Sequence, residues 1–127
     1  MMGQNECGGA GMEMLLIHGG KKLCGEVRIH GAKNSTLPLM AASLVCSGEC
    51  VLHNCPSLSD VDTSVRILRH LGCGVQMSGG DIVVDPTTAD RGDIPDELMR
   101  EMRSSIIFLG PMVCRLNRAT LSYPGGC

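Results

Sequence analysis

The chain has 127 residues, a formal net charge of −2, one Phe, one Tyr and no Trp, so a single domain with an aliphatic core is expected. Its 11 basic and 13 acidic residues are mixed along the sequence, which argues against the clustered basic surface of a nucleic-acid-binding protein. No run reaches the roughly 18 uncharged apolar residues of a membrane span, and the N-terminus lacks a signal-peptide pattern, so a cytoplasmic protein without a membrane partner is expected.

The first part of the chain changes from a glycine-rich start to periodic segments. Residues 1–12 lack hydrophobic periodicity and are expected to be a disordered leader. From residue 13, two β-like runs flank a turn at residues 19–22 and predict a pair of strands. Residues 33–46 carry apolar side chains on nearly every face, which predicts a buried helix that tolerates Pro38 near its start.

The next segments predict a strand and an amphipathic helix. Residues 49–54 alternate like a strand, and residues 59–71 have helical periodicity. Ser59 is the expected N-cap of the helix and Gly72 its C-cap. The apolar stripe of this helix comprises Val61, Val65, Leu68 and Leu71.

The last third of the chain predicts a hairpin, a long helix and a final strand. Residues 74–85 hold two strands around the Gly-Gly turn at 79–80, residues 94–116 form one helix, and residues 119–123 form a strand. Helices alternate with strands and no dinucleotide or Walker-type phosphate loop is present, so the expected class is α/β or α+β rather than a Rossmann or P-loop domain.

A first candidate site is the segment Gly-Ala-Lys-Asn at residues 31–34, between a predicted strand and a predicted helix. Backbone N–H groups at a helix N-terminus favour an anion. Lys33 adds a positive charge for a phosphate or carboxylate, and the amide of Asn34 can both donate and accept hydrogen bonds. The alternative is that Lys33 is a solvated lysine and Asn34 a helix cap.

A second candidate is Cys127, which follows Pro-Gly-Gly at residues 124–126. Two glycines allow a mobile loop to approach a ligand and present a thiol, whose reactivity depends on its pKa. The alternative is a structural cysteine, because the chain has eight of them. Most are expected to be reduced fillers of the core, as Cys46 and Cys114 within predicted helices illustrate.

A third candidate is Arg103, which borders the apolar run at residues 106–113 of the predicted long helix. An arginine in such a place binds an anion or a carboxylate. The alternative is an ordinary salt bridge to Asp96, Glu97 or Glu101.

The remaining polar residues form no recognisable set. Cysteines and histidines at residues 46–55 lack paired CxxC spacing, so no metal site is expected. Asp60 and Asp62 suit the first turn of their predicted helix electrostatically and are interpreted as structural.

Four ordered segments together resemble the enolpyruvyl transferase family, and the match runs from about residue 14 to residue 127. Gly-Ala-Lys-Asn and Pro-Gly-Gly-Cys are similar to the branch that acts on UDP-N-acetylglucosamine, whereas the shikimate-pathway branch carries a Lys-Ser pair and lacks this cysteine. The segments are residues 23–44, 54–72, 102–116 and 121–127.

This resemblance implies transfer of the enolpyruvyl group of phosphoenolpyruvate to the 3-hydroxyl of UDP-N-acetylglucosamine, with release of phosphate by addition and elimination. The reaction opens peptidoglycan precursor synthesis and needs no metal or organic cofactor. At the matching positions, Lys33 is expected to contact phosphoenolpyruvate, Asn34 to lie beside it at the substrate interface, and Arg103 to contact the UDP-sugar. Cys127 is the expected loop acid.

The resemblance also implies two similar domains of repeated βαβαββ units, an inside-out α/β barrel that is incomplete here. Residues 13–31 are expected to be strands that join the second domain, and residues 32–127 to be a partial first domain that stops at the catalytic loop. The chain is therefore expected to be an N-terminal fragment, inactive by itself. Two alternatives are a non-catalytic module that binds phosphate or UDP-sugar, and a thiol-rich redox or metal protein.

Overall fold

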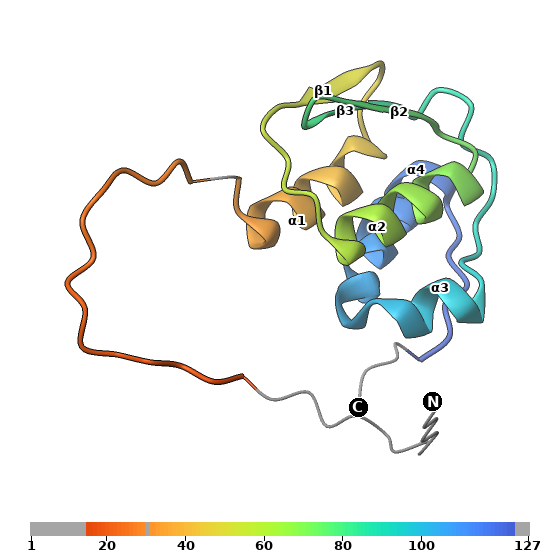
Figure 1. Ribbon diagram of the computed structural model, residues 1–127. Coiled ribbons are helices and arrows are strands. Elements are labelled where there is room, and N and C mark those ends of the chain that lie inside the picture. The colour runs from red at the N-terminus through yellow and green to blue at the C-terminus, as the bar shows by residue number, and fades with distance from the viewer. Residues whose placement is uncertain (1–14, 30, 124–127) are drawn as a thin grey trace, which may run out of the picture.

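The computed structural model describes residues 15–29 and 31–123 of the chain (Figure 1). A three-stranded antiparallel sheet in the order β1-β3-β2 lies over one side of a group of helices, which confirms the expected mixture of helix and sheet. The elements in chain order are α1 (Lys33–Ser43), β1 (Cys50–Leu52), α2 (Ser59–His70), β2 (Gly74–Ser78), β3 (Asp81–Asp85), α3 (Asp96–Glu101), the 3-10 helix η1 (Arg103–Phe108) and α4 (Leu109–Leu116).

Helix α1 packs against α2, β1, β3 and η1 with one face only. Leu37 and Met40 are buried on that face, whereas Leu39 is 53% exposed, so the prediction of a helix buried on nearly every face is wrong. Pro38 lies inside the helix and has no N–H, so the carbonyl of Asn34 cannot accept the usual helical hydrogen bond from residue 38.

Helix α2 confirms the predicted apolar stripe, because all four of its residues are buried. The helix begins at Ser59, but the prediction of Ser59 as its N-cap is wrong. The N-cap is Leu58, and its carbonyl accepts hydrogen bonds from the N–H groups of Val61 and Asp62. The helix ends beside Gly72, which has φ +97°. The N–H of the next residue, Cys73, donates to the carbonyl oxygen of Leu68 at 3.0 Å. A glycine is the residue that tolerates this left-handed conformation.

The predicted hairpin is confirmed as β2 and β3. Val75 pairs with Val84, and Met77 pairs with Ile82. Ile82 and Val84 are two positions apart, so they lie on the same face of β3, and both are buried. These strands therefore close the core on the side of the sheet that faces α1 and α2.

The predicted helix at residues 94–116 is wrong, because the structure divides it into α3, η1 and α4. Met102 breaks it with an extended backbone, φ −132° and ψ 114°. The side chain of Met102 is buried, and the next buried residues, Ser105 and Phe108, follow it at intervals of three positions. Because side chains three apart eclipse in a 3-10 helix, this spacing suits η1 better than a continuous α-helix.

The predicted strand pair is absent from residues 15–29, which contain no regular structure and run apart from the helices and the sheet (Figure 1). Their apolar side chains are exposed, and Leu23 and Ile29 have exposed fractions of 93% and 85%. An isolated hairpin is marginally stable, because it has no layer on which to bury such side chains. The predicted membership of this segment in a second domain stays a prediction.

The predicted strand at residues 119–123 is reduced to one parallel bridge between Asp93 and Thr120. The N–H of Thr120 donates to the carbonyl of Gly92 at 2.7 Å, and the N–H of Ile94 donates to the carbonyl of Thr120 at 3.1 Å. These two bonds hold the chain after α4 against the loop before α3.

The cysteines within the described ranges are free thiols with different environments. Cys73 is buried and fills the core as expected, and Cys46 is half-buried. Cys114 is exposed on α4, so its interpretation as a core residue is wrong. None of the helices over residues 15–29 and 31–123 is long and apolar enough to cross a membrane.

Candidate functional site

Lys33, Asn34 and Arg103 line one cavity of about 400 Å³ between α1, α2 and η1. The structure thus brings together three residues that the sequence singled out, although Arg103 is 70 positions from Lys33 in the chain. Cys127 lies outside the described residues. The other residues that line the cavity are Leu37, Pro38, Asp60, Ser104 and Ile107.

The position of Lys33 and Asn34 depends on a close backbone approach at Gly31. A Cβ atom on Gly31 would lie 2.0 Å from the carbonyl oxygen of Asn54, far inside van der Waals contact. Asn54 itself has φ 56°, a left-handed conformation that Asn tolerates. The first turn of α1 is therefore set directly against the loop between β1 and α2, and the sequence motif contains a glycine for this packing reason.

Lys33 forms an ion pair with Asp60 across the cavity wall, from the first turn of α1 to the first turn of α2. The side chain of Asp60 is 22% exposed and that of Lys33 is 45% exposed. Lys33 is thus a partly solvated lysine that also has an ion-pair partner. Sequence reasoning assigned Asp60 only to its own helix, because periodicity does not show which residues of separate helices meet.

Arg103 reaches the cavity because the chain changes direction at Met102. It is the first residue of η1, and Ser104 beside it lines the same cavity. The acid on the other side of Met102, Glu101, accepts hydrogen bonds from Arg66 and Thr63 at the contact between α3 and α2.

The cavity is equipped to hold an anion. Lys33 and Arg103 supply two positive charges against the one negative charge of Asp60, and Asn34 adds an amide. Ammonium and guanidinium groups together suit phosphate and carboxylate oxygens. Within the described part of the chain, no three His, Cys, Asp or Glu side chains gather as a metal site.

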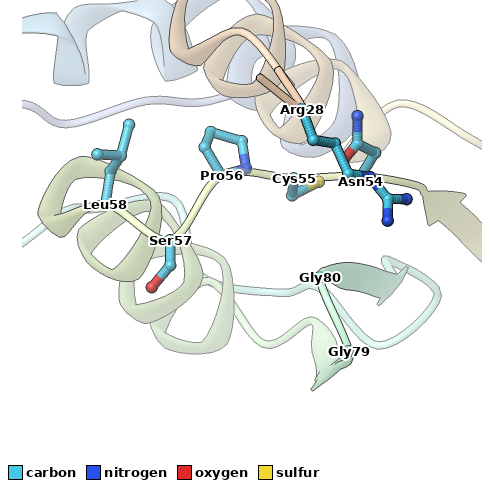
Figure 2. A pocket seen from close by; sticks show the side chains of 8 residues that line it. All are labelled: Arg28, Asn54, Cys55, Pro56, Ser57, Leu58, Gly79 and Gly80. Carbon is cyan, nitrogen blue, oxygen red and sulfur yellow. The ribbon is translucent and has the colours of Figure 1, made fainter. Parts of the chain in front are cut away.

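A second cavity, of about 610 Å³, lies between the segment before α1 and the hairpin (Figure 2). Figure 2 shows Arg28 and Asn54 at one end and Leu58 at the other, with the turn at Gly79 and Gly80 opposite. Among the described residues that line it, Arg28 is the single charged one, so the cavity lacks the cluster of charged groups found around Lys33. The other lining residues are Cys55, Pro56 and Ser57.

Comparison with known proteins identifies relatives of most of the chain. Residues 17–127 match the model of the EPSP synthase family, described as 3-phosphoshikimate 1-carboxyvinyltransferase. The chain is 54% identical over 111 residues to UDP-N-acetylglucosamine 1-carboxyvinyltransferase 2 of Caldanaerobacter subterraneus subsp. tengcongensis, covering 87% of this chain and 27% of that protein. It is 46% identical over 117 residues to UDP-N-acetylglucosamine 1-carboxyvinyltransferase of Saccharophagus degradans, covering 91% and 28%.

A solved structure shares the fold. The enolpyruvyl transferase NikO from Streptomyces tendae superposes with a TM-score of 0.68 at 30% sequence identity. The superposition covers 76% of this chain and 23% of that protein. The chain thus spans about a quarter of the length of the proteins to which it is similar.

Proposed function

The chain belongs to the EPSP synthase family of enolpyruvyl transferases, and from this premise we propose that it forms part of the active site of a UDP-N-acetylglucosamine 1-carboxyvinyltransferase. The enzyme transfers the enolpyruvyl group of phosphoenolpyruvate to the 3-hydroxyl of UDP-N-acetylglucosamine and releases phosphate. The observation that carries this proposal is the gathering of Lys33, Asn34 and Arg103 around one cavity. The proposed setting is peptidoglycan precursor synthesis in the cytoplasm.

The proposed roles follow from the chemistry of the side chains. Lys33 binds an acidic group of phosphoenolpyruvate, Asn34 lies beside it, and Arg103 binds the UDP-sugar. Cys127 protonates the methylene carbon of phosphoenolpyruvate while the sugar hydroxyl oxygen bonds to the neighbouring carbon. The sugar hydroxyl gives up its proton to a base as this bond forms. The adduct then loses a proton from its new methyl group together with phosphate from the neighbouring carbon, which restores the carbon–carbon double bond in the product.

The charge of the cavity supports an anionic substrate. Phosphoenolpyruvate carries a phosphate and a carboxylate, and UDP-N-acetylglucosamine carries a diphosphate. The described lining residues carry an excess of one positive charge, which favours either group, and Leu37, Pro38 and Ile107 supply apolar side chains to the lining. In the proposed arrangement, residues 32–127 belong to the first domain and residues 13–31 to the second.

A chimera tests the proposed function directly. Residues 17–127 replace the matching segment of the Caldanaerobacter protein, and release of phosphate from phosphoenolpyruvate is measured with and without UDP-N-acetylglucosamine. We expect release that depends on the sugar nucleotide and that falls by at least about a hundredfold in Cys127→Ala, because removing a positioned acid typically costs that much. The unmodified 127-residue chain is assayed beside it.

Two outcomes of the chimera assay would contradict the proposed function. A chimera that folds but releases phosphate only with shikimate 3-phosphate would assign the chain to the other branch of the family. A folded chimera that releases none with either acceptor would contradict the proposed activity.

A second candidate is a module that binds phosphate or UDP-sugar without turnover. It is favoured by the cavity around Lys33, whose described lining residues all lie between positions 33 and 107. Its signature is a rise in the melting temperature of the 127-residue chain with UDP-N-acetylglucosamine, without product from the chimera.

A further inference from the structure

We propose that Asp60 is the resting partner of Lys33 and that a phosphate-bearing anion takes its place when it enters the cavity. The ion pair then holds the lysine in position before binding and limits the affinity of the site for anions. This inference rests on the proposed function only in identifying the natural anion as phosphoenolpyruvate.

The two partners differ in how firmly they are held. Asp60 is in the first turn of α2, where its carbonyl accepts a hydrogen bond from Ser64 Oγ at 2.9 Å, and its short side chain is mostly covered. Lys33 carries its charge on a flexible four-carbon stem and is about half exposed. Displacement therefore moves the ammonium group and leaves the carboxylate where it is.

The lysine can change partner because an ammonium group has three donors. A carboxylate with one negative charge competes for them with a phosphate that carries more charge and more acceptor oxygens. Arg103, on η1, lines the cavity beside the pair and adds a second positive charge for the incoming anion. The phosphate is thus favoured over Asp60 as soon as it is bound between the two cations.

In the described part of the chain, the charged groups that line the cavity come from three elements: Lys33 from α1, Asp60 from α2 and Arg103 from η1. Glu101, the nearby acid of α3, binds Arg66 and Thr63. Asp62, the other acid in the first turn of α2, is exposed and does not line the cavity. Among the described residues, Asp60 is therefore the carboxylate in a position to compete with the anion, and Asp62 is a matched control.

The test uses the 127-residue chain, with inorganic phosphate and phosphoenolpyruvate as probes, and follows the Lys33 side chain and the Asp60 carboxyl carbon by NMR. We expect phosphate to move both signals. Asp60→Asn keeps the shape of the side chain and removes its charge, so it is expected to bind phosphate about fivefold more tightly, the equivalent of one exposed ion pair released. Asp62→Asn is expected to leave the Kd within about twofold.

A double variant separates competition from a general change in surface charge. In the Lys33→Ala background, Asp60→Asn is expected to give no further gain, because the group for which the two anions compete is absent. Circular dichroism checks that the helices of each variant are intact.

Several outcomes overturn the inference. Unchanged or weaker phosphate binding in Asp60→Asn contradicts competition, and so does a gain that persists without Lys33. A carboxyl signal of Asp60 that does not respond to phosphate in the wild-type chain contradicts it too, even if a variant fails to fold. A chain that binds no phosphate shows that no anion exchange occurs in this cavity. Failure of the proposed function would appear separately, as a folded chimera without phosphate release.

Discussion

The guanidinium of Arg115 on α4 donates to the carbonyl oxygen of Cys46, 69 positions away, at 3.0 Å. Its second Nη atom donates to the carbonyl oxygen of Pro86 at 2.9 Å. One side chain thus connects α4 to the turn after α1 and to the end of β3. Both acceptors are in irregular segments, where backbone carbonyls otherwise depend on water.

Replacing Arg115 by Ala is expected to lower the free energy of unfolding by about 2 kcal/mol, because two charge-assisted hydrogen bonds at a half-buried position are lost. Urea denaturation at pH 7 measures the change. Arg100→Ala, at an exposed position on α3, is the control and is expected to change stability by less than about 0.5 kcal/mol. An equal loss of unfolding free energy in the two variants would show that the hydrogen bonds of Arg115 to the two carbonyl groups do not stabilise the fold.

Replacing Gly31 by Ala is expected to push the start of α1 away from Asn54, because the new Cβ would stand 2.0 Å from its carbonyl oxygen. The cost is expected to be about 1–3 kcal/mol, the usual range for overpacking. Gly48→Ala is the control, since a Cβ there meets nothing within 4 Å. Urea denaturation and a weaker response of Lys33 to phosphate measure the effect, and a Gly31→Ala chain as stable as the control would refute the close approach.

Asp81 makes the stability of the hairpin end depend on pH. Its pKa is lowered, chiefly by the hydrogen bond with His53 Nδ1 at 2.9 Å and also by the N–H of Asn54. A carboxylate with a lowered pKa in the folded state stabilises the protein above its unfolded pKa of about 3.9 and loses this contribution as the pH falls through the folded value.

Asp81→Asn is therefore expected to be less stable than the wild type near pH 6, with the difference disappearing as the pH falls through the lowered pKa of Asp81. Urea midpoints between pH 2.5 and pH 6 measure this change. A difference that stays constant down to pH 2.5 would show that the charge of Asp81 is not the cause.

The cysteines are expected to react with iodoacetamide at very different rates. Burial raises the pKa of Cys73 to about 11, and the pKa of Cys50 is raised to about 11 chiefly by its hydrogen bond with Cys46 and then by burial. Roughly one such thiol in a thousand is ionised at pH 8, and the thiolate is the reactive form.

Among the six described cysteines, mass spectrometry of the native chain at pH 8 is therefore expected to show Cys24 and Cys114, which are exposed, alkylated first. Cys73 is expected to react only after denaturation, because it is also inaccessible. Alkylation of Cys73 at the rate of Cys114 in folded protein would contradict its position in the core.

The sequence by itself determined the elements whose signals are local. The stripe of α2 follows from a 3.6-residue period, its end from Gly72, and the hairpin from two alternating runs around a Gly-Gly turn. Four segments at residues 23–44, 54–72, 102–116 and 121–127 together resembled the family, and two of them contain the three predicted residues of the cavity, Lys33, Asn34 and Arg103. The sequence predicts the helix stripe, the helix end, the hairpin and the short motifs because each of them depends on residues within a few positions of one another.

The tertiary structure alone decided which of these elements meet. Met102 interrupts a segment with good helical propensity because its side chain, like those of Ser105 and Phe108, is buried in the core, and this break places Arg103 beside the first turn of α1. The ion pair of Lys33 with Asp60 joins two helix starts that periodicity treats separately. Pairing between distant segments depends on how their surfaces pack, and a pattern within one segment does not contain that information.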